Sequence, residues 1–261
     1  MTEPSATPSL RTRLTGKSRL LGTFIKTPGP HGIEIIGRTG FDFVVIDEEH
    51  APFDRAAIDI AMLAAGAAGI PALVRVSGIG GILSALDLGA SGVMVPHVYS
   101  AAIAHDVVAA CRYRGDPNAI KRGFTNSCRA GAYGRRGLTE HVQSSDEATV
   151  VIAMIEDPQA LDAIDEIAAV PGIDAFFLGR GDLTVAFGAP DPGDPRVREA
   201  VARICTAVRK AGKTLCAMVG QPEEAAALRE LGVSAFIMNS DQGMLRQAAL
   251  SVVQAFAQLR P

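Results

Sequence analysis

Eight short apolar runs that alternate with longer amphipathic stretches constrain the fold of this 261-residue chain more than any other feature. The runs lack strict alternation of apolar and polar residues, which is typical of parallel strands covered on both faces. Eight strands joined by helical crossovers predict an α/β protein, a single (β/α)₈ TIM barrel over residues 1–261, with an open doubly wound sheet as the alternative. The expected strands are Leu21–Ile25, Phe43–Asp47, Ala72–Val76, Gly92–Pro96, Val150–Ile155, Ala175–Leu178, Thr214–Val219 and Ala235–Met238.

The stretches between these runs have the apolar spacing of helices, and three of them are followed by a glycine. Gly40, Gly89 and Gly232 each precede a strand, where glycine adopts the left-handed conformation that ends a helix. The clearest expected helices are Arg55–Ala68, Ala101–Arg112, Leu161–Ala169, Arg196–Ala211, Glu223–Leu231 and Gly243–Leu259.

One segment, Arg114–Ala148, interrupts the alternation of expected strands and helices. It is polar and rich in glycine, and its basic residues are Lys121, Arg122, Arg129, Arg135 and Arg136. A long excursion inside a compact domain usually serves a function. We therefore expect this excursion to run along the active-site face of the barrel.

The composition excludes several classes of protein. Hydrophobic residues make up 48% of the chain and aromatic residues 5%, so layers of aliphatic side chains should form the core. A net charge of −3 argues against a nucleic-acid binder, and no apolar run reaches the roughly 18 residues that a membrane span needs. The N-terminal sequence has no apolar signal segment, and the four cysteines match no zinc or redox spacing. These features predict a cytoplasmic protein.

The second expected strand ends in a cluster of charged residues, Asp47, Glu48, Glu49 and His50. In a barrel, polar residues at the carboxyl ends of strands are candidates for function. In the functional interpretation, Asp47 orients the imidazole of His50, which then moves protons near neutral pH. The alternative is a solvated turn that leads to the break at Pro52.

The third expected strand contains Arg75 in an otherwise apolar run. An arginine is rarely a core residue, so its guanidinium should meet an anion in the barrel mouth. Arg75 would stabilise a developing oxyanion, or it forms a salt bridge to Asp47 or Glu49.

The fifth and sixth expected strands each lead to carboxylates. Glu156 and Asp182 would lie at one level of the barrel, where two carboxylates with open positions suit a hard divalent cation. Asp157 and Asp182 could instead cap the helices that follow them. Gly179 and Gly181 leave the backbone N–H groups of this turn accessible to an anion.

Taken together, these positions resemble the HpcH/HpaI-type aldolase/citrate lyase family, which includes the class II pyruvate aldolases such as 2,4-dihydroxyhept-2-enedioate aldolase. The resemblance extends over roughly residues 20–245. The matching pieces are Phe43–Pro52, Val74–Val76, Val95–Pro96, Lys121–Phe124, Arg129–Ala130, Tyr133–Gly134, Ile155–Glu156 and Leu178–Leu183.

The resemblance implies a divalent-metal-dependent aldehyde-lyase on a (β/α)₈ barrel. Such an enzyme reversibly cleaves a 4-hydroxy-2-oxo acid to pyruvate, or a similar 2-keto acid, and an aldehyde through a metal-stabilised enolate. By analogy Glu156 and Asp182 bind Mg²⁺, Mn²⁺ or Co²⁺, and Glu49 holds a metal-bound water.

By the same analogy Arg75 stabilises the enolate oxygen, and Asp47 with His50 forms the acid–base pair. Backbone N–H groups near Gly181 and Asp182 would hold the pyruvate carboxylate. Family members resemble one another in forming hexamers, as trimers of dimers, with the last helix packed on a neighbouring subunit.

This chain departs from the family pattern at several positions. Glu48 replaces a glycine, Met154 replaces a glutamine, and Arg180-Gly181 replaces Pro-Ala, so Met154 and Arg180 are candidates for substrate binding. Further candidate contacts to the substrate or its loop are Arg122, Arg129 and Tyr133.

Three alternatives remain open. A citrate-forming aldol enzyme or a CoA-ester lyase would use Arg122 and Arg129 to bind a larger polyanion. A non-catalytic barrel would bind a keto acid without turnover. Schiff-base chemistry needs a lysine at a strand end, and among the five lysines only Lys26 stands at one.

Overall fold

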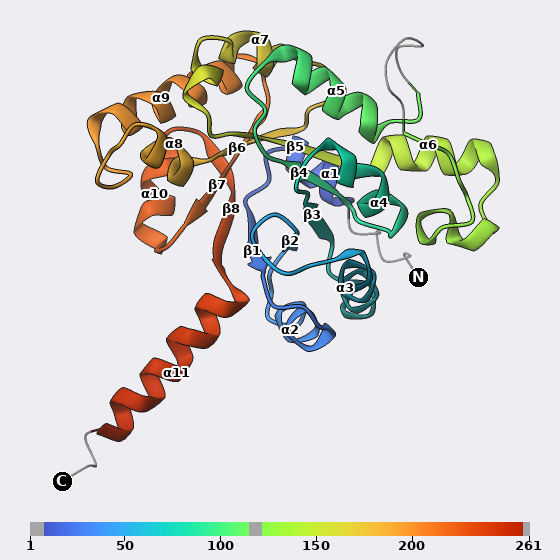
Figure 1. The fold of residues 1–261 in the computed structure, drawn as a ribbon, viewed down its shortest axis with the longest axis horizontal. Coiled ribbons are helices and arrows are strands. Elements are labelled where there is room, and N and C mark those ends of the chain that lie inside the picture. Colours follow the sequence, from blue (N-terminus) through green and yellow to red (C-terminus); the bar gives the residue numbers. More distant parts are fainter. Residues whose placement is uncertain (1–7, 115–121, 258–261) are drawn as a thin grey trace, which may run out of the picture.

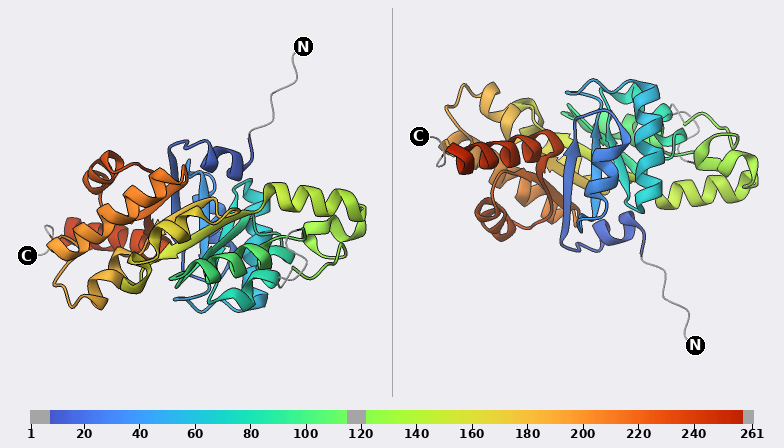
Figure 2. Two further views of the ribbon diagram at one scale, coloured as in Figure 1. Left: turned by 90° about the horizontal axis from the view of Figure 1, so that it is seen from above. Right: turned by 90° about the horizontal axis from the view of Figure 1, so that it is seen from below.

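The structure, a computed structural model, describes residues 8–114 and 122–257 and forms a closed barrel of eight parallel strands inside a layer of helices (Figures 1 and 2). Each strand pairs with the next along the chain, and β8 closes on β1 through pairs such as Leu20 with Ala235. Closure confirms the barrel and rules out the open sheet. The strands are β1 (Leu20–Ile25), β2 (Phe43–Asp47), β3 (Ala72–Arg75), β4 (Gly92–Val95), β5 (Val150–Ile155), β6 (Ala175–Leu178), β7 (Thr214–Val219) and β8 (Val233–Ser240).

The core has two layers, one inside the barrel and one between the barrel and its helices. Inside the barrel, Phe24, Phe43 and Phe177 pack among Leu, Val, Ile and Met side chains. The outer layer is almost wholly aliphatic. The expected layers of branched residues are therefore present, with three phenylalanines filling the barrel interior.

The helices match most of the expected positions, and three short ones are additional. The glycines at positions 40, 89 and 232 have φ values of 94°, 98° and 97°, which confirms their left-handed conformation. The expected helices appear as α3 (Arg55–Ala68), α5 (Ala101–Cys111), α7 (Ile164–Ala169), α9 (Pro195–Lys210), α10 (Pro222–Glu230) and α11 (Asp241–Ala257). The additional helices are α1 (Leu10–Thr15), α2 (Pro30–Ile36) and α4 (Ile82–Asp87).

The excursion lies elsewhere than predicted. It follows α5 and precedes β5, so both of its ends are at the amino-terminal side of the strands. Arg112, at the end of α5, donates to the carbonyl of Thr149 over 2.9 Å and ties the two ends together. The placement along the active-site face is therefore wrong, because helix α5 has already returned the chain to the opposite rim. The described part contains a 3₁₀ turn at Arg129–Gly134 and α6 (Leu138–Ala148), whereas Lys121 lies outside the described residues.

Helix α11 projects from the barrel at the opposite end of the molecule from α6 (Figures 1 and 2). None of its 17 residues is buried, and apolar side chains such as Leu245 and Val252 face outward. Within the described part of the chain, no helix is both long and apolar enough to cross a membrane.

Candidate active site

A cavity of about 470 Å³ opens at the carboxyl ends of the strands. Several strands contribute to its wall, as expected when parallel strands end at one rim. The cavity therefore brings together side chains that are far apart in sequence. The predicted site residues that line it are His50, Arg75, Met154, Arg180, Gly181 and Asp182.

Asp47, at the end of β2, is fully buried and surrounded by donors. Its Oδ1 accepts from Arg75 Nε over 2.9 Å and from the backbone N–H of His50 over 3.1 Å. Its Oδ2 accepts from Arg75 Nη2 over 2.7 Å and forms a 3.2 Å ion pair with Lys26 Nζ. Although burial alone would raise it, the pKa of Asp47 is lowered by the hydrogen bonds and charges of these partners. Asp47 is thus held as an anion. The salt bridge between Arg75 and Asp47, which was one of the two hypotheses for Arg75, is present.

The imidazole of His50 lies near a different carboxylate from the predicted one. Asp47 contacts His50 only through the backbone N–H in the described network, because the acceptor sites of Asp47 are taken up by Arg75 and Lys26. The Nε2 atom of His50 is 3.8 Å from Glu49 Oε2, which also lies 3.4 Å from Arg75 Nε. In the structure, Glu49 is therefore the carboxylate that can stabilise a protonated His50.

Glu156 follows β5, and its side chain is almost fully buried. Its Oε1 accepts the backbone N–H of His97 over 2.9 Å, and its side chain packs against Gly179. Burial raises the pKa of Glu156 to about 7, with a further contribution from Asp182 against the lowering effect of the His97 hydrogen bond.

His97 follows a strand end, a position expected to line the barrel mouth, and in the structure it contacts Glu156 and Asp157. It follows Pro96 at the end of β4 with a φ of 56°, and its Nδ1 is 3.2 Å from Asp157 Oδ2 and 3.6 Å from Glu156 Oε1. Despite partial desolvation, the hydrogen bond to Asp157 and the surrounding carboxylates raise the pKa of His97. Asp157 is the N-cap residue of the turn at Pro158, as the capping alternative expected, but its side chain makes no capping hydrogen bond. The only signal in the sequence was the position of His97 just after a strand.

Asp182 is exposed in the first turn of α8 (Arg180–Ala186), for which Gly179 is the N-cap residue. The alternative that Asp182 caps this helix is therefore wrong. Within the described residues no cluster of three or more His, Cys, Asp or Glu side chains is arranged to bind a metal. The pair Glu156 and Asp182 still fits a divalent cation that keeps several waters, because Glu156 is a buried acid beside a second carboxylate.

Of the departures from the family pattern, Met154 and Arg180-Gly181 line the cavity, and Glu48 does not. Met154 is buried in the inner layer of the barrel and contributes to the cavity wall. Arg180 donates from Nη2 to the carbonyl of Met218 over 2.7 Å and lies 3.6 Å from Glu224. Arg180 thereby links the turn after β6 to β7 and α10.

The excursion residues do not contribute to this cavity. Arg122 is buried, pairs with Asp87 over 3.0 Å and stacks over Tyr113, and Arg129 pairs with Asp59. Tyr133 is 67% exposed. In the described part of this chain, Arg122, Arg129 and Tyr133 therefore lie outside the site, which corrects their assignment as substrate contacts within one subunit.

Comparisons with known proteins find similar chains that match over almost the whole length. The model of the family described as HpcH/HpaI aldolase/citrate lyase matches residues 20–248. The 2-dehydro-3,6-dideoxy-6-sulfogluconate aldolase of Pseudomonas putida is 32% identical over 245 residues, which cover 93% of this chain and 94% of the relative. The hydroxypyruvate/pyruvate aldolase of Pseudomonas aeruginosa is 31% identical, with 94% and 91% covered.

Solved structures show the same relationship. An HpcH/HpaI aldolase/citrate lyase family protein from Burkholderia cenocepacia J2315 superimposes with a TM-score of 0.89 at 30% identity, covering 96% of this chain and 100% of that one. The citrate synthase SbnG gives a TM-score of 0.85 at 32% identity, covering 96% and 98%. The fold, the order of the motifs and these matches together show that the chain belongs to the HpcH/HpaI aldolase/citrate lyase family.

Proposed function

We propose that this protein is a divalent-metal-dependent aldolase that reversibly cleaves a 4-hydroxy-2-oxo acid to pyruvate, or a similar 2-keto acid, and an aldehyde. The observation that carries the proposal is the arrangement of charge at one cavity. Asp182, cationic Arg75 and the imidazole of His50 line this cavity, and the buried carboxylate of Glu156 packs against Gly179 in its wall.

Glu156 and Asp182 are the residues that would hold the metal. When bound, a divalent cation supplies a Lewis acid that polarises the carbonyl of the keto acid. Mg²⁺, Mn²⁺ and Co²⁺ all suit two carboxylates completed by waters, and we propose one of these three as the physiological ion. The backbone N–H groups of Gly181 and Asp182 are proposed to bind the carboxylate of the keto acid, since both residues line the cavity.

Arg75 has the role of stabilising negative charge. As the C3–C4 bond breaks, negative charge develops on the keto oxygen, and a guanidinium fixed in the cavity wall stabilises it. The two hydrogen bonds from Arg75 to Asp47 fix the guanidinium before substrate arrives. We assign Asp47 this positioning role.

His50 accepts the proton of the C4 hydroxyl during cleavage and returns it in the reverse reaction. Its side chain is 56% exposed and lines the cavity, so the imidazole is accessible to substrate. Glu49, at 3.8 Å from Nε2, stabilises the imidazolium that forms. Glu49 is also the carboxylate proposed to hold a metal-bound water.

The direct test is release of pyruvate from 4-hydroxy-2-oxopentanoate with and without EDTA. We expect EDTA to abolish turnover and Mn²⁺ to restore it. The substitution Glu156→Gln should strongly lower the rate of pyruvate release. Activity that is unaffected by chelation would contradict the metal-dependent mechanism. Borohydride with pyruvate should leave no adduct, whereas trapping at Lys26 would indicate Schiff-base chemistry instead.

A citrate-forming aldol reaction is the second candidate, because SbnG, a citrate synthase, matches nearly the whole chain. Citrate formation from oxaloacetate and a two-carbon donor such as acetyl-CoA, measured beside pyruvate release, separates the two reactions. The polyanion site that both this candidate and the CoA-ester lyase alternative would build from Arg122 and Arg129 loses its support, since these arginines already pair with Asp87 and Asp59. A barrel that only binds keto acids would bind pyruvate without any turnover.

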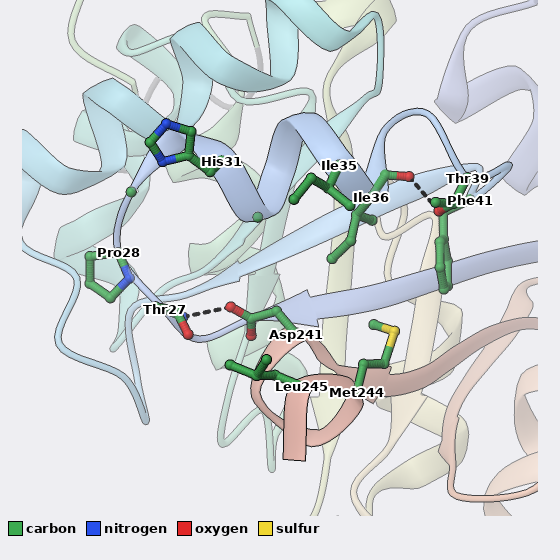
Figure 3. Close-up of a pocket in the computed structure, with 12 residues that line it drawn as sticks. Thr27, Pro28, His31, Ile35, Ile36, Thr39, Phe41, Asp241, Met244 and Leu245 are labelled. Atoms are coloured by element: carbon green, nitrogen blue, oxygen red, sulfur yellow. Dashed lines mark hydrogen bonds between the residues drawn. The ribbon is translucent and has the colours of Figure 1, made fainter. Parts of the chain in front are cut away.

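We also propose a homo-oligomer, a hexamer built as a trimer of dimers, in which α11 packs on a neighbouring copy. A groove of about 460 Å³ lies between α2 and the start of α11, with Ile35 and Ile36 on one side and Met244 and Leu245 on the other (Figure 3). Its apolar walls and the unburied face of α11 suit contact with a second chain.

Light scattering after size exclusion tests the assembly. Leu245→Glu should reduce the mass of the particle. Leu63→Glu, at a leucine of α3 that is also exposed, should leave the mass unchanged. A monomeric wild-type protein would contradict the proposal. The four cysteines are free, in keeping with the cytoplasmic location that we propose.

A further inference from the structure

We propose that Arg180 is a positioning residue, which clamps the first turn of α8 to β7 and α10 and thereby holds the carboxylate of Asp182 in place for a divalent cation. This inference rests on the proposed metal-dependent function and adds the contact that prepares the cation site. Arg180, which the sequence made a candidate for substrate binding, is the first residue of α8 and stands two residues before Asp182.

The first turn of α8 has few stabilising features of its own. Gly179, the N-cap residue, has no side chain that could accept a capping hydrogen bond. Gly181 lies inside the turn, where a residue without Cβ leaves the backbone more freedom than any other would. A helix of seven residues is also too short to be stable in isolation. The shape of this turn therefore depends on contacts with neighbouring elements.

Arg180 supplies such contacts on the side of β7 and α10. Its Nη2 donates to the carbonyl of Met218 over 2.7 Å and lies 3.6 Å from Glu224 Oε2. The same oxygen of Glu224 accepts the backbone N–H of Gly220 over 2.8 Å. Because the Arg180 side chain is only 19% exposed, water competes little for these contacts. One guanidinium thus joins α8 to the end of β7 and to α10.

The other side of the turn is fixed by packing, since Gly179 lies directly against the buried side chain of Glu156. Asp182 is exposed and lines the cavity, and among the described residues no hydrogen bond or ion pair holds its carboxylate. The backbone of the turn therefore sets where this carboxylate lies. The charge of Asp182 acts on Glu156, and like charges repel, so the pair needs a firm scaffold before a cation binds.

The charge of Arg180 would by itself have the opposite effect on metal binding. A cation in the cavity wall disfavours a second cation nearby. If Arg180 acted only through its electrostatic field, removal of its charge would strengthen metal binding. If it touched only the keto acid, metal binding without keto acid would not change. A clamp predicts weaker metal binding, so the sign of the change separates the three roles.

The first test is calorimetric titration with Mn²⁺ in the absence of keto acid. We expect Arg180→Met to bind Mn²⁺ about tenfold more weakly than the wild type, since a charge-assisted hydrogen bond that fixes the turn is lost. Unchanged or tighter Mn²⁺ binding would overturn the inference.

A second substitution tests whether the loss acts through the backbone. Adding Gly181→Ala to Arg180→Met should recover about two- to fivefold in Mn²⁺ affinity. Alanine restricts the backbone at a position where no atom lies within 4 Å of its Cβ. With Arg180 present the turn is already held, so Gly181→Ala alone should have no such effect. If the double variant recovers no affinity, the effect does not act through the turn and the inference is wrong.

Hydrogen exchange in EDTA tests the clamp without any metal. Peptides that cover residues 179–188 should exchange faster in Arg180→Met than in the wild type, because the turn opens more often. Peptides from β2 should exchange as in the wild type, which also shows that the variant is folded. Equal exchange of residues 179–188 in both proteins would contradict the clamp, and faster exchange throughout the chain would assign Arg180 a general structural role instead.

Arg203→Met is the matched control. Arg203, on α9, also donates to a backbone carbonyl, that of Leu161 over 2.8 Å, but does not line the cavity. It should match the wild type in Mn²⁺ affinity and in exchange of residues 179–188, and a loss equal to that of Arg180→Met would overturn the inference. A wild type that binds no Mn²⁺ would refute the metal-dependent function itself, a result obtained before any variant is compared.

Discussion

Gly179→Ala tests whether the close approach of the β6 turn to Glu156 builds the metal site. A Cβ atom at position 179 would lie 2.2 Å from the Cβ of Glu156 and 2.9 Å from its Oε2. Gly181, two residues along the same turn, has no atom within 4 Å of the corresponding position. The pair Gly179→Ala and Gly181→Ala therefore makes the same chemical change in a tight and in an open place.

The geometry sets the size of the expected effect. The two Cβ atoms must separate by about 1.2 Å to reach an ordinary contact of 3.4 Å, and the Glu156 side chain has little room because it is buried. Overpacking of this kind costs about 1–3 kcal/mol, which lowers the melting temperature of a domain of this size by roughly 2–12 °C. The displaced carboxylate should also bind Mn²⁺ more weakly.

Thermal unfolding in EDTA and calorimetric titration with Mn²⁺ measure the two effects separately. Gly181→Ala should match the wild type in melting temperature and in metal affinity. If Gly179→Ala has the same melting temperature as Gly181→Ala and binds Mn²⁺ with the same affinity, then the contact between Gly179 and Glu156 does not shape the site. If both variants bind Mn²⁺ more weakly than the wild type, the metal affinity depends on the whole turn after β6 and not on the contact between Gly179 and Glu156.

Three further predictions follow from the same side chains. In EDTA, the free energy of unfolding should fall by up to about 3 kcal/mol as the pH rises from about 4.5 to about 7. Folding raises the pKa of Glu156 to about 7, so ionisation of this carboxyl over that range disfavours the folded state. Denaturant titrations of Glu156→Gln should show a free energy of unfolding that depends less on pH. Asp47→Asn leaves the charge of Arg75 poorly compensated and should cost about 3–5 kcal/mol in urea unfolding, whereas Asp59→Asn, which removes a surface pair, should cost less than about 1 kcal/mol. His50→Ala should lower kcat for pyruvate release by about 10²–10⁴-fold without changing the melting temperature, and an unchanged kcat would exclude His50 as the base.

The barrel and the rim of the site could be predicted because both follow from local sequence. Apolar runs mark buried parallel strands, and the carboxyl ends of parallel strands share one rim, so Arg75 and Asp182 were expected in one cavity. Helix α2 was missed because seven residues starting at a Pro after a Gly give little periodicity. The excursion was misplaced because its composition says nothing about which rim it occupies.

The partners of individual side chains were beyond the reach of the sequence. Asp47 and His50 are three residues apart, which suggests a side-chain pair, yet Arg75 and Lys26 from other strands occupy the carboxylate first. His97 reaches Glu156 and Asp157 from a backbone with positive φ, a conformation that is uncommon for residues other than glycine and that no local pattern indicates. Competition among donors from separate strands, not local spacing, decided both contacts.

The two hydrogen bonds that the carboxylate of Asp241 accepts have a consequence for the evolution of this site. They join the end of β1 to the start of α11 across 215 positions of sequence. Because both donors are backbone N–H groups, substitutions other than proline at positions 26 and 27 leave the bonds in place, whereas a substitution of Asp241 removes both acceptors. Positions 26 and 27 should therefore vary among relatives that keep an aspartate at position 241.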